Sequence, residues 1–95
     1  MHYNYPVRFA WDPKKAESNL RKHKVSFEEA ATIFADPLSV VHPDDAHPER
    51  SLIVGTSSQT RLLLCVHIVL EEEEVRIISA RHTTKHERRD YEEGR

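Results

Sequence analysis

Apolar residues in this chain of 95 residues form short segments with two different periodicities. Between residues 27 and 34 they recur at the i, i+3, i+4, i+7 spacing of a helix that buries one face. Residues 61–70, RLLLCVHIVL, are apolar at almost every position, which is typical of a central strand covered on both faces. The pattern therefore predicts a domain that combines helices with a sheet.

Capping residues define the expected helices. Asp12 is suited to an N-cap and Pro13 to the first helical position, so a helix is predicted from Pro13 to His23. Ser26 and Glu29 fit a capping box for a second helix, which Asp36-Pro37 should end. A third, basic helix is expected from Thr84 to Tyr91.

Five segments are expected to form strands: 5–10, 38–42, 51–55, 61–70 and 75–81. The four glutamates 71–74 should form the turn between the last two strands. The order β-α-α-β-β-β-β-α predicts an α+β fold, with helices against an antiparallel sheet of four to five strands. The length suits one domain spanning residues 1–95.

Strand alternation predicts which side chains share a face of the sheet. In the fourth strand one face is expected to carry Leu62, Leu64, Val66, Ile68 and Leu70. If the glutamates form a four-residue turn, that face continues into the last strand with Val75, Ile77, Ser79 and Arg81. The opposite face would then carry Arg61, Cys65, His67 and Arg76. A one-residue change of register would reverse the assignment for the last strand.

Composition and charge narrow the class of protein. No apolar run is long enough to span a membrane, and the N-terminus lacks a signal-peptide pattern, so a cytoplasmic protein is expected. Because Cys65 is the only cysteine, no internal disulfide is expected. The formal net charge is −2, but residues 14–24 carry a net +4 and residues 76–89 another +4. If the fold brings these two segments together, they form one basic surface.

Two segments together are distinctive: FAWDPKKAESNLRKHKVSFEEA at residues 9–30, and RIISAR followed by ERRDYEE near the C-terminus. The pair resembles the BrnT family of type II toxins, a branch of the RelE/ParE-like superfamily. The likeness extends from Phe9 to Glu93, and its middle part rests on Asp36-Pro37-Leu38 and Glu49-Arg50. Two positions depart from the family pattern: Thr60 stands where a glycine is often found, and His82 where a basic residue is often found.

The resemblance implies a small RelE-like fold and a metal-independent endoribonuclease that cleaves RNA and inhibits translation. It also implies a BrnA-like antitoxin, which neutralises the toxin and supplies the DNA-binding part of the complex, so that DNA is contacted only indirectly. No cofactor and no metal site are expected. The residues of this chain that match functional positions of the family motifs, as the resemblance implies, are Lys22, His23, Arg50, Arg76, Arg81, Glu87, Arg88 and Tyr91.

Cleavage of RNA without a metal needs a base, an acid and cations that stabilise the charged phosphorane. His23 is the candidate for proton transfer, and Arg50 and Arg81 are candidates for phosphate contacts. Lys22, Arg76, Arg88 and Tyr91 are the expected RNA-binding residues, with Tyr91 stacking on a base.

Structural roles are open for the same residues. His23 is also suited to the C-terminus of a helix, and Arg50 to ion pairs with the acids of its own loop. Arg76 also fits an ordinary sheet surface, and Tyr91 fits packing of the last helix on the sheet. His82 and His86 have the spacing of a metal pair on a helix, but no third ligand with defined spacing accompanies them.

Three functions compete at this point. The first is the toxin ribonuclease, and the second is the same fold without catalysis, acting as a binding module in complex with an antitoxin. Direct DNA binding by the basic helices is the third, and the absence of a helix-turn-helix signature together with the negative net charge disfavours it.

Overall fold

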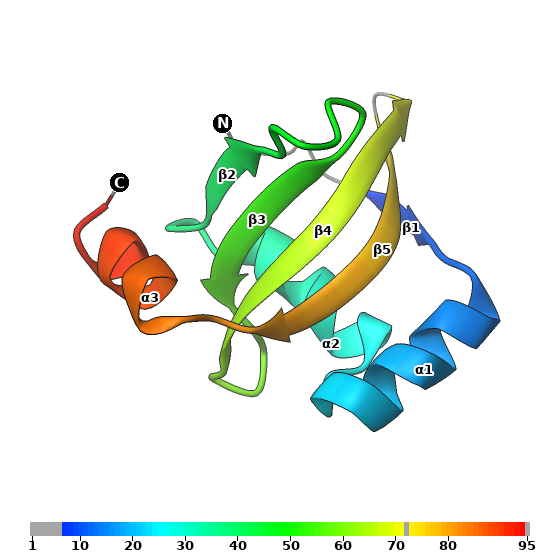
Figure 1. Ribbon diagram of the computed structural model, residues 1–95, viewed down its shortest axis with the longest axis horizontal. Helices are drawn as coiled ribbons and strands as arrows, with labels where there is room; N and C mark the ends of the chain where they lie inside the picture. The colour runs from blue at the N-terminus through cyan, green and yellow to red at the C-terminus, as the bar shows by residue number, and fades with distance from the viewer. Residues whose placement is uncertain (1–6, 72, 95) are drawn as a thin grey trace.

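The computed structural model describes residues 7–71 and 73–94, which form a sheet with helices on both faces (Figure 1). The sheet order is β1-β5-β4-β3-β2. Its strands are β1 (Arg8–Ala10), β2 (Val40–Pro43), β3 (Ser51–Thr56), β4 (Leu62–Glu71) and β5 (Glu74–His82). The helices are α1 (Pro13–His23), α2 (Phe27–Thr32) followed by the 3-10 turn η1 (Ile33–Ala35), and α3 (Lys85–Glu92). The predicted element order and the central position of residues 61–70 are confirmed.

The sheet is mixed, so the prediction of a wholly antiparallel sheet is wrong in one strand. β1 runs parallel to β5, with Arg8 opposite Glu74 and Ala10 opposite Arg76, whereas every other pairing is antiparallel. β1 and β5 are separated by most of the chain, so no hairpin turn fixes their relative direction. The first strand was expected from Tyr5, which lies outside the described residues; the strand described begins at Arg8.

Local side-chain contacts set the helix ends. Asp12 accepts a hydrogen bond from the Lys14 amide at 2.9 Å, and α1 ends at His23 as predicted. Ser26 caps α2 by accepting the Glu29 amide at 3.0 Å. The Glu29 carboxylate completes no capping box, however, because it binds other partners. A complete capping box is found instead at α3, between Thr84 and Glu87.

The predicted division of side chains between the two faces is wrong in part. Cross-strand partners share a face, and the pairing shifts by one residue between Val66 and His67, so that Val66 is opposite Ser79 but His67 is opposite Ile77. Val75 and Ile77 therefore lie with Cys65 and His67, while Arg76 joins the face of Ile68. The turn is also shorter than predicted, because Glu71 pairs with Glu74.

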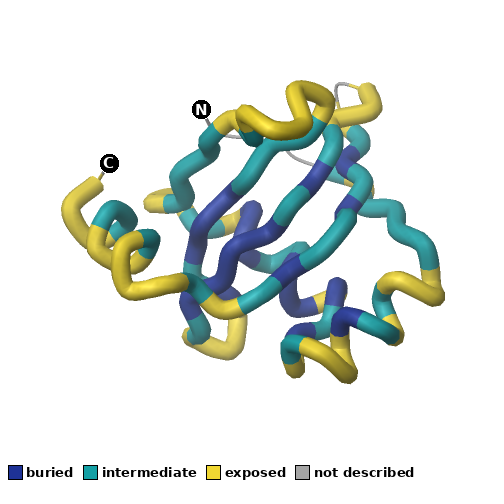
Figure 2. The backbone as a smooth tube through the Cα atoms, viewed as in Figure 1, coloured by how far each residue is buried: buried dark blue, intermediate teal, exposed yellow. Residues whose placement is uncertain are grey.

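The main core lies between the sheet and α1, α2 and η1. Its fully buried members are Val25, Phe27, Ala30, Ile33, Ile53, Leu63 and Cys65. Figure 2 shows this buried interior running along the strands behind which α2 lies. The opposite face carries a smaller apolar cluster of Val54, Leu62 and Leu64, against which Tyr91 of α3 packs. One face is thus closed by helices and the other is covered only in part.

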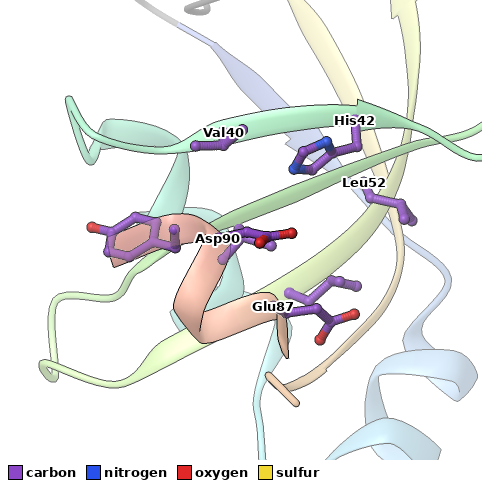
Figure 3. Close-up of a pocket in the computed structure, with 8 residues that line it drawn as sticks. Val40, His42, Leu52, Glu87 and Asp90 are labelled. Atoms are coloured by element: carbon purple, nitrogen blue, oxygen red, sulfur yellow. The ribbon is translucent and has the colours of Figure 1, made fainter. Parts of the chain in front are cut away.

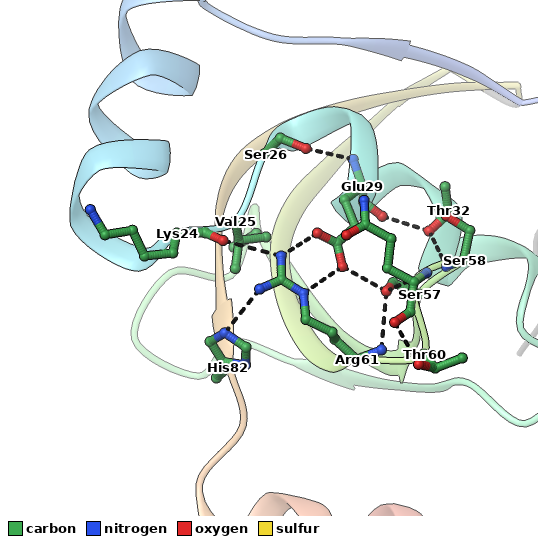
Figure 4. A network of polar contacts seen from close by, with 12 residues as sticks. Lys24, Val25, Ser26, Glu29, Thr32, Ser57, Ser58, Thr60, Arg61 and His82 are labelled. Carbon is green, nitrogen blue, oxygen red and sulfur yellow. Dashed lines mark hydrogen bonds and ion pairs between the residues drawn. The ribbon is translucent and has the colours of Figure 1, made fainter.

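A polar network joins the segments at one end of the sheet (Figure 4). The Glu29 side chain is only 3% exposed and forms an ion pair with both Arg61 Nη2 and Arg61 Nε, the latter at 2.8 Å. Ser57 donates its hydroxyl to the same carboxylate at 2.7 Å. Arg61 also donates to the Lys24 carbonyl at 3.1 Å and lies 3.5 Å from Nε2 of His82. The hydrogen bonds from Arg61 lower the pKa of Glu29 despite its burial.

Replacement of Glu29 by glutamine should destabilise the fold, because it removes the charge that faces Arg61 and breaks the two-point contact. We expect the free energy of unfolding to fall by about 2 kcal/mol for Glu29→Gln, measured by urea denaturation. The matched control is Glu28→Gln on the exposed side of α2, which should stay within about 0.5 kcal/mol of the parent. Equal effects of the two substitutions would contradict this account of the network.

Stability should also depend on His67, which is fully buried in β4 with its ring 4.9 Å from that of Phe34. Burial lowers the pKa of His67 to about 4, so the folded chain keeps it neutral where the unfolded chain binds a proton. Stability should therefore fall as the pH drops below about 6.5, by about 2 kcal/mol at pH 5. His67→Leu should show a shallower dependence in urea denaturation over this range, and an unchanged slope would refute the assignment.

Candidate active site

The face of the sheet opposite α1 and α2 carries the most chemically varied side chains, and we call it the open face. Cross-strand register defines its rows. One row runs Val40, Val54, Leu64 and Arg81, and the next runs His42, Leu52, Val66 and Ser79. Ile68 and Arg76 form a third. α3 lies along only one side of this face (Figure 1), so part of it is accessible.

A cavity of about 160 Å³ lies between α3 and the sheet on this face (Figure 3). Its floor is apolar, from Val40, Leu52, Val54 and Leu64. His42 from β2 lies on one side, and Glu87 and Asp90 from α3 lie on the other. The cavity therefore combines an imidazole and two carboxylates above an apolar surface that suits the flat face of a nucleobase.

Arg81 borders this cavity through its contact with Glu87. The two guanidinium nitrogens donate to the two carboxylate oxygens of Glu87 at 2.9 and 3.0 Å, a two-point ion pair. Glu87 also accepts the Thr84 amide at 2.9 Å. The hydrogen bonds from Arg81 lower the pKa of Glu87 in spite of partial burial, so this carboxylate is charged at neutral pH.

Tyr91 holds the other end of α3. Its hydroxyl donates to Oδ2 of Asp36 at 2.5 Å and lies 3.2 Å from the Thr56 hydroxyl, while the Thr56 amide donates to the same Asp36 oxygen at 2.8 Å. Burial raises the pKa of Asp36, but the bonds from Thr56 and Tyr91 outweigh it and leave that pKa lowered. The ring packs on the apolar cluster of the open face. The structure thus shows the packing role of Tyr91; its stacking on RNA stays a prediction.

His23 and Lys22 lie in a different cavity, of about 190 Å³, between α1 and β5. Its other lining residues are Lys15, Ser18, Asn19, Ile78 and Ser79. The two basic segments, residues 14–24 and 76–89, do meet at the end of β5. There Arg61 donates a hydrogen bond to the Lys24 carbonyl and lies 3.5 Å from Nε2 of His82. His23 nevertheless lines the α1 cavity, whereas Arg81 is turned toward Glu87, which lines the cavity under α3 on the open face.

The remaining predicted residues are spread over the open face and α3. Arg50 directly precedes β3. The row of Arg81 crosses β3 at Val54, four residues further on, so Arg50 lies about 13 Å from that row along the strand direction. Its Nε is buried and has no hydrogen-bond partner among the described residues. Arg76 lies in β5 at the same end of the sheet as Arg50. Arg88 is exposed on α3, 3.9 Å from Glu92. The structure therefore does not bring Arg50 together with Arg81 or His23.

Sequence reasoning did not single out His42 or Asp36. Alternation in β2 places His42 on the face of Val40, but the strand is too short for that alternation to stand out in the sequence. The sequence indicates Asp36 only as the end of a helix and as part of the family likeness, because its contacts with Thr56 and Tyr91 depend on residues far along the chain.

The i, i+4 spacing of His82 and His86 does not place the two histidines on one helix. His82 ends β5, whereas His86 belongs to α3 and lies 3.4 Å from Asp90. Within residues 7–71 and 73–94, no three His, Cys, Asp or Glu side chains are grouped as a metal site requires. Over the same described ranges, no helix is long and apolar enough to cross a membrane.

Removal of the Tyr91 hydroxyl should loosen α3 while leaving the ring in place. We expect Tyr91→Phe to lower the free energy of unfolding by about 1 kcal/mol, because a bond to the charged Asp36 is lost. Amide hydrogen exchange within α3 should become faster than in the sheet. Arg88→Ala, which removes only an exposed ion pair, is the control and should change neither measurement appreciably. Equal exchange in the two variants would contradict the role of the hydroxyl.

Comparison with known proteins supports the same fold. The crystal structure of the Brucella abortus ribonuclease toxin BrnT, determined at 1.1 Å resolution, superposes with a TM-score of 0.68 at 18% sequence identity. The match covers 83% of this chain and 99% of that one. The expected small α+β fold is thus confirmed. No curated protein matches the chain.

A family model gives the more specific result. The model described as "Ribonuclease toxin, BrnT, of type II toxin-antitoxin system" matches residues 11–87, which is most of the chain and includes α1, the whole of β2–β5 and the start of α3. The protein therefore belongs to the BrnT family and is a ribonuclease toxin of a type II toxin-antitoxin system.

Proposed function

We propose that this toxin is a metal-independent endoribonuclease, that it inhibits translation by cleaving RNA in the cytoplasm, and that the open face binds the RNA. The observation that carries the proposal is the position of Arg81, beside a cavity that holds an imidazole and carboxylates. These groups can supply proton transfer and charge stabilisation from the chain's own side chains. The whole of residues 1–95 is proposed to act as one domain.

The reaction we propose is attack of the ribose 2′-oxygen on the adjacent phosphorus. A bond forms from the 2′-oxygen to phosphorus, the bond to the 5′-oxygen breaks, and a 2′,3′-cyclic phosphate results. A base removes the 2′-proton and an acid returns a proton to the leaving oxygen. Arg81 stabilises the negative charge on the phosphorane with two parallel hydrogen bonds.

Arg81 can take this role only after a change of partner. Its guanidinium is bound to Glu87, so a phosphate must replace the carboxylate there. The released Glu87 then lacks its cation, keeps the hydrogen bond from the Thr84 amide, and can accept a proton from the substrate beside it. His42, on the other side of the cavity, is the proposed second proton-transfer group, because it shares the cavity with Glu87.

The other predicted residues keep supporting roles in this proposal. Arg76 lies on the open face in β5 and Arg88 is exposed on α3, and they can contact phosphates on either side of the cleaved one. Arg50 lies with Arg76 at the far end of the sheet and is proposed to bind RNA there rather than at the cleaved phosphate. Proton transfer by His23 stays a prediction, and the assay below tests it beside His42.

The antitoxin proposed for this toxin is BrnA-like and contacts DNA on behalf of the complex. The second candidate function, a binding module without catalysis, is favoured by one observation. Arg81 is already neutralised by Glu87, and a toxin fold in which this guanidinium stays bound to its own carboxylate would still bind an antitoxin. Cleavage by the purified protein distinguishes these two functions.

The test is incubation of the purified full chain with RNA in the presence of EDTA. We expect chelator-resistant cleavage with 2′,3′-cyclic phosphate ends, reduced at least 100-fold in Arg81→Ala and in His42→Ala. Arg89→Ala and His86→Ala are matched controls, because each removes the same side chain from an exposed position on α3. His23→Ala completes the set: loss of cleavage in it alone would move the proton transfer to the α1 cavity.

Absence of cleavage by the wild-type chain would leave the binding module as the function. Cleavage that requires a divalent cation would overturn the metal-independent reaction while leaving the ribonuclease itself in place.

A further inference from the structure

We infer that the cavity between α1 and β5 is a phosphate-binding subsite for the RNA strand that leaves the open face. The inference rests on the proposed function, since it assigns a second part of the same substrate. It concerns the seven residues Lys15, Ser18, Asn19, Lys22, His23, Ile78 and Ser79 that line this cavity.

The chemistry of the lining fits an anion. Lys15 and Lys22 contribute two positive charges, His23 an imidazole, and Ser18 and Ser79 two hydroxyl donors. None of the seven lining residues is acidic, although acids outnumber Lys and Arg by 16 to 14 in the whole chain. A cavity of this composition favours phosphate oxygens over a cation or an apolar group.

The lining residues of α1 form one stripe along the helix. Lys15, Ser18, Asn19 and Lys22 are spaced i, i+3, i+4 and i+7, so they face β5 together. Asn19 fixes the helix in this orientation, because its amide donates to the Ala80 carbonyl at 2.9 Å and accepts the Ala80 amide at 3.1 Å. The two lysines are about 10 Å apart along the axis, which lets them contact neighbouring phosphates of one strand.

Ser79 connects this cavity with the open face. It lies opposite Val66, in the row next to Arg81, and it also lines the α1 cavity. β1 pairs with β5 only as far as Arg76, so the outer edge of β5 beyond that residue is not covered by a strand. An RNA strand on the open face can therefore cross β5 near Ser79 and reach Lys15 and Lys22.

An acidic protein segment is the competing occupant. The cavity offers it little, because Ile78 is the only apolar lining residue and protein interfaces usually bury apolar anchors at their centre. Continuity with the open face and a lining of charged and hydroxyl groups favour RNA.

The experiment measures binding of the full-length protein to a labelled 2′-O-methyl oligonucleotide, which cannot be cleaved because its 2′-oxygen is blocked. Affinity is followed by fluorescence anisotropy over a range of KCl concentrations. We expect Lys15→Ala/Lys22→Ala to bind about tenfold more weakly at moderate salt. The plot of log association constant against log salt concentration should become less steep, its negative slope decreasing in magnitude by about 1.4. The control is Lys14→Ala/Arg21→Ala, which removes the same charge from exposed positions of α1 outside the cavity.

Each outcome decides a separate point. If the wild type cleaves RNA but the two double variants bind the oligonucleotide equally, the subsite is refuted and the proposed function stands. If the wild type neither binds nor cleaves RNA, the proposed function itself fails. If Lys15→Ala/Lys22→Ala weakens binding of the antitoxin but not of the oligonucleotide, the cavity serves an acidic protein segment and the inference is wrong.

Discussion

The ion pair between Glu29 and Arg61 is the contact on which the functional end of this protein depends. It joins α2 to the start of β4, and through Arg61 it reaches the carbonyl of Lys24 and the ring of His82. These contacts place the end of α1 and the end of β5 relative to each other. A buried carboxylate needs such a partner, and the pair in turn accepts only one arrangement of the segments around it. Arg61 is therefore a structural cation, although it lies among the basic residues.

The two faces of the sheet divide structure from chemistry. One face is filled by apolar residues of α2 and η1, with His67 kept neutral inside it. The other carries Arg81 and Arg76 beside apolar positions that are only partly covered. α3 contributes no fully buried residue and is held there largely by polar contacts, at Glu87 and at Tyr91. Polar contacts of this kind exchange more readily for a ligand than a packed apolar seam does, which suits a helix that borders a binding surface.

Local signals in the sequence predicted the helices well, and long-range pairing explains where prediction failed. Asp12 and Pro13 located α1 correctly because a cap acts within one turn. Glu29 misled the capping-box prediction, since its true partner Arg61 is 32 residues away. The shift of register between Val66 and His67 reversed part of the face assignment, because the extra residue lies in β5 and a one-residue bulge leaves no signal in the alternation of side chains. The candidate site was predicted only in pieces for the same reason: Arg81 was found, but its cavity with His42 depends on strand order.

At Thr60 the backbone keeps a left-handed conformation although the residue is not the glycine expected from the family pattern. Thr60, where the family resemblance leads us to expect a glycine, adopts φ 62°, the left-handed region in which a β-branched side chain is unfavourable. The turn is kept because the Thr60 amide donates to the Ser57 carbonyl at 2.9 Å, and the Ser57 hydroxyl in turn donates to Glu29. The buried ion pair thus fixes the turn that strains Thr60, and Arg61 is the next residue in the chain after this turn. The strain at Thr60 and the position of Arg61 are two consequences of one constraint.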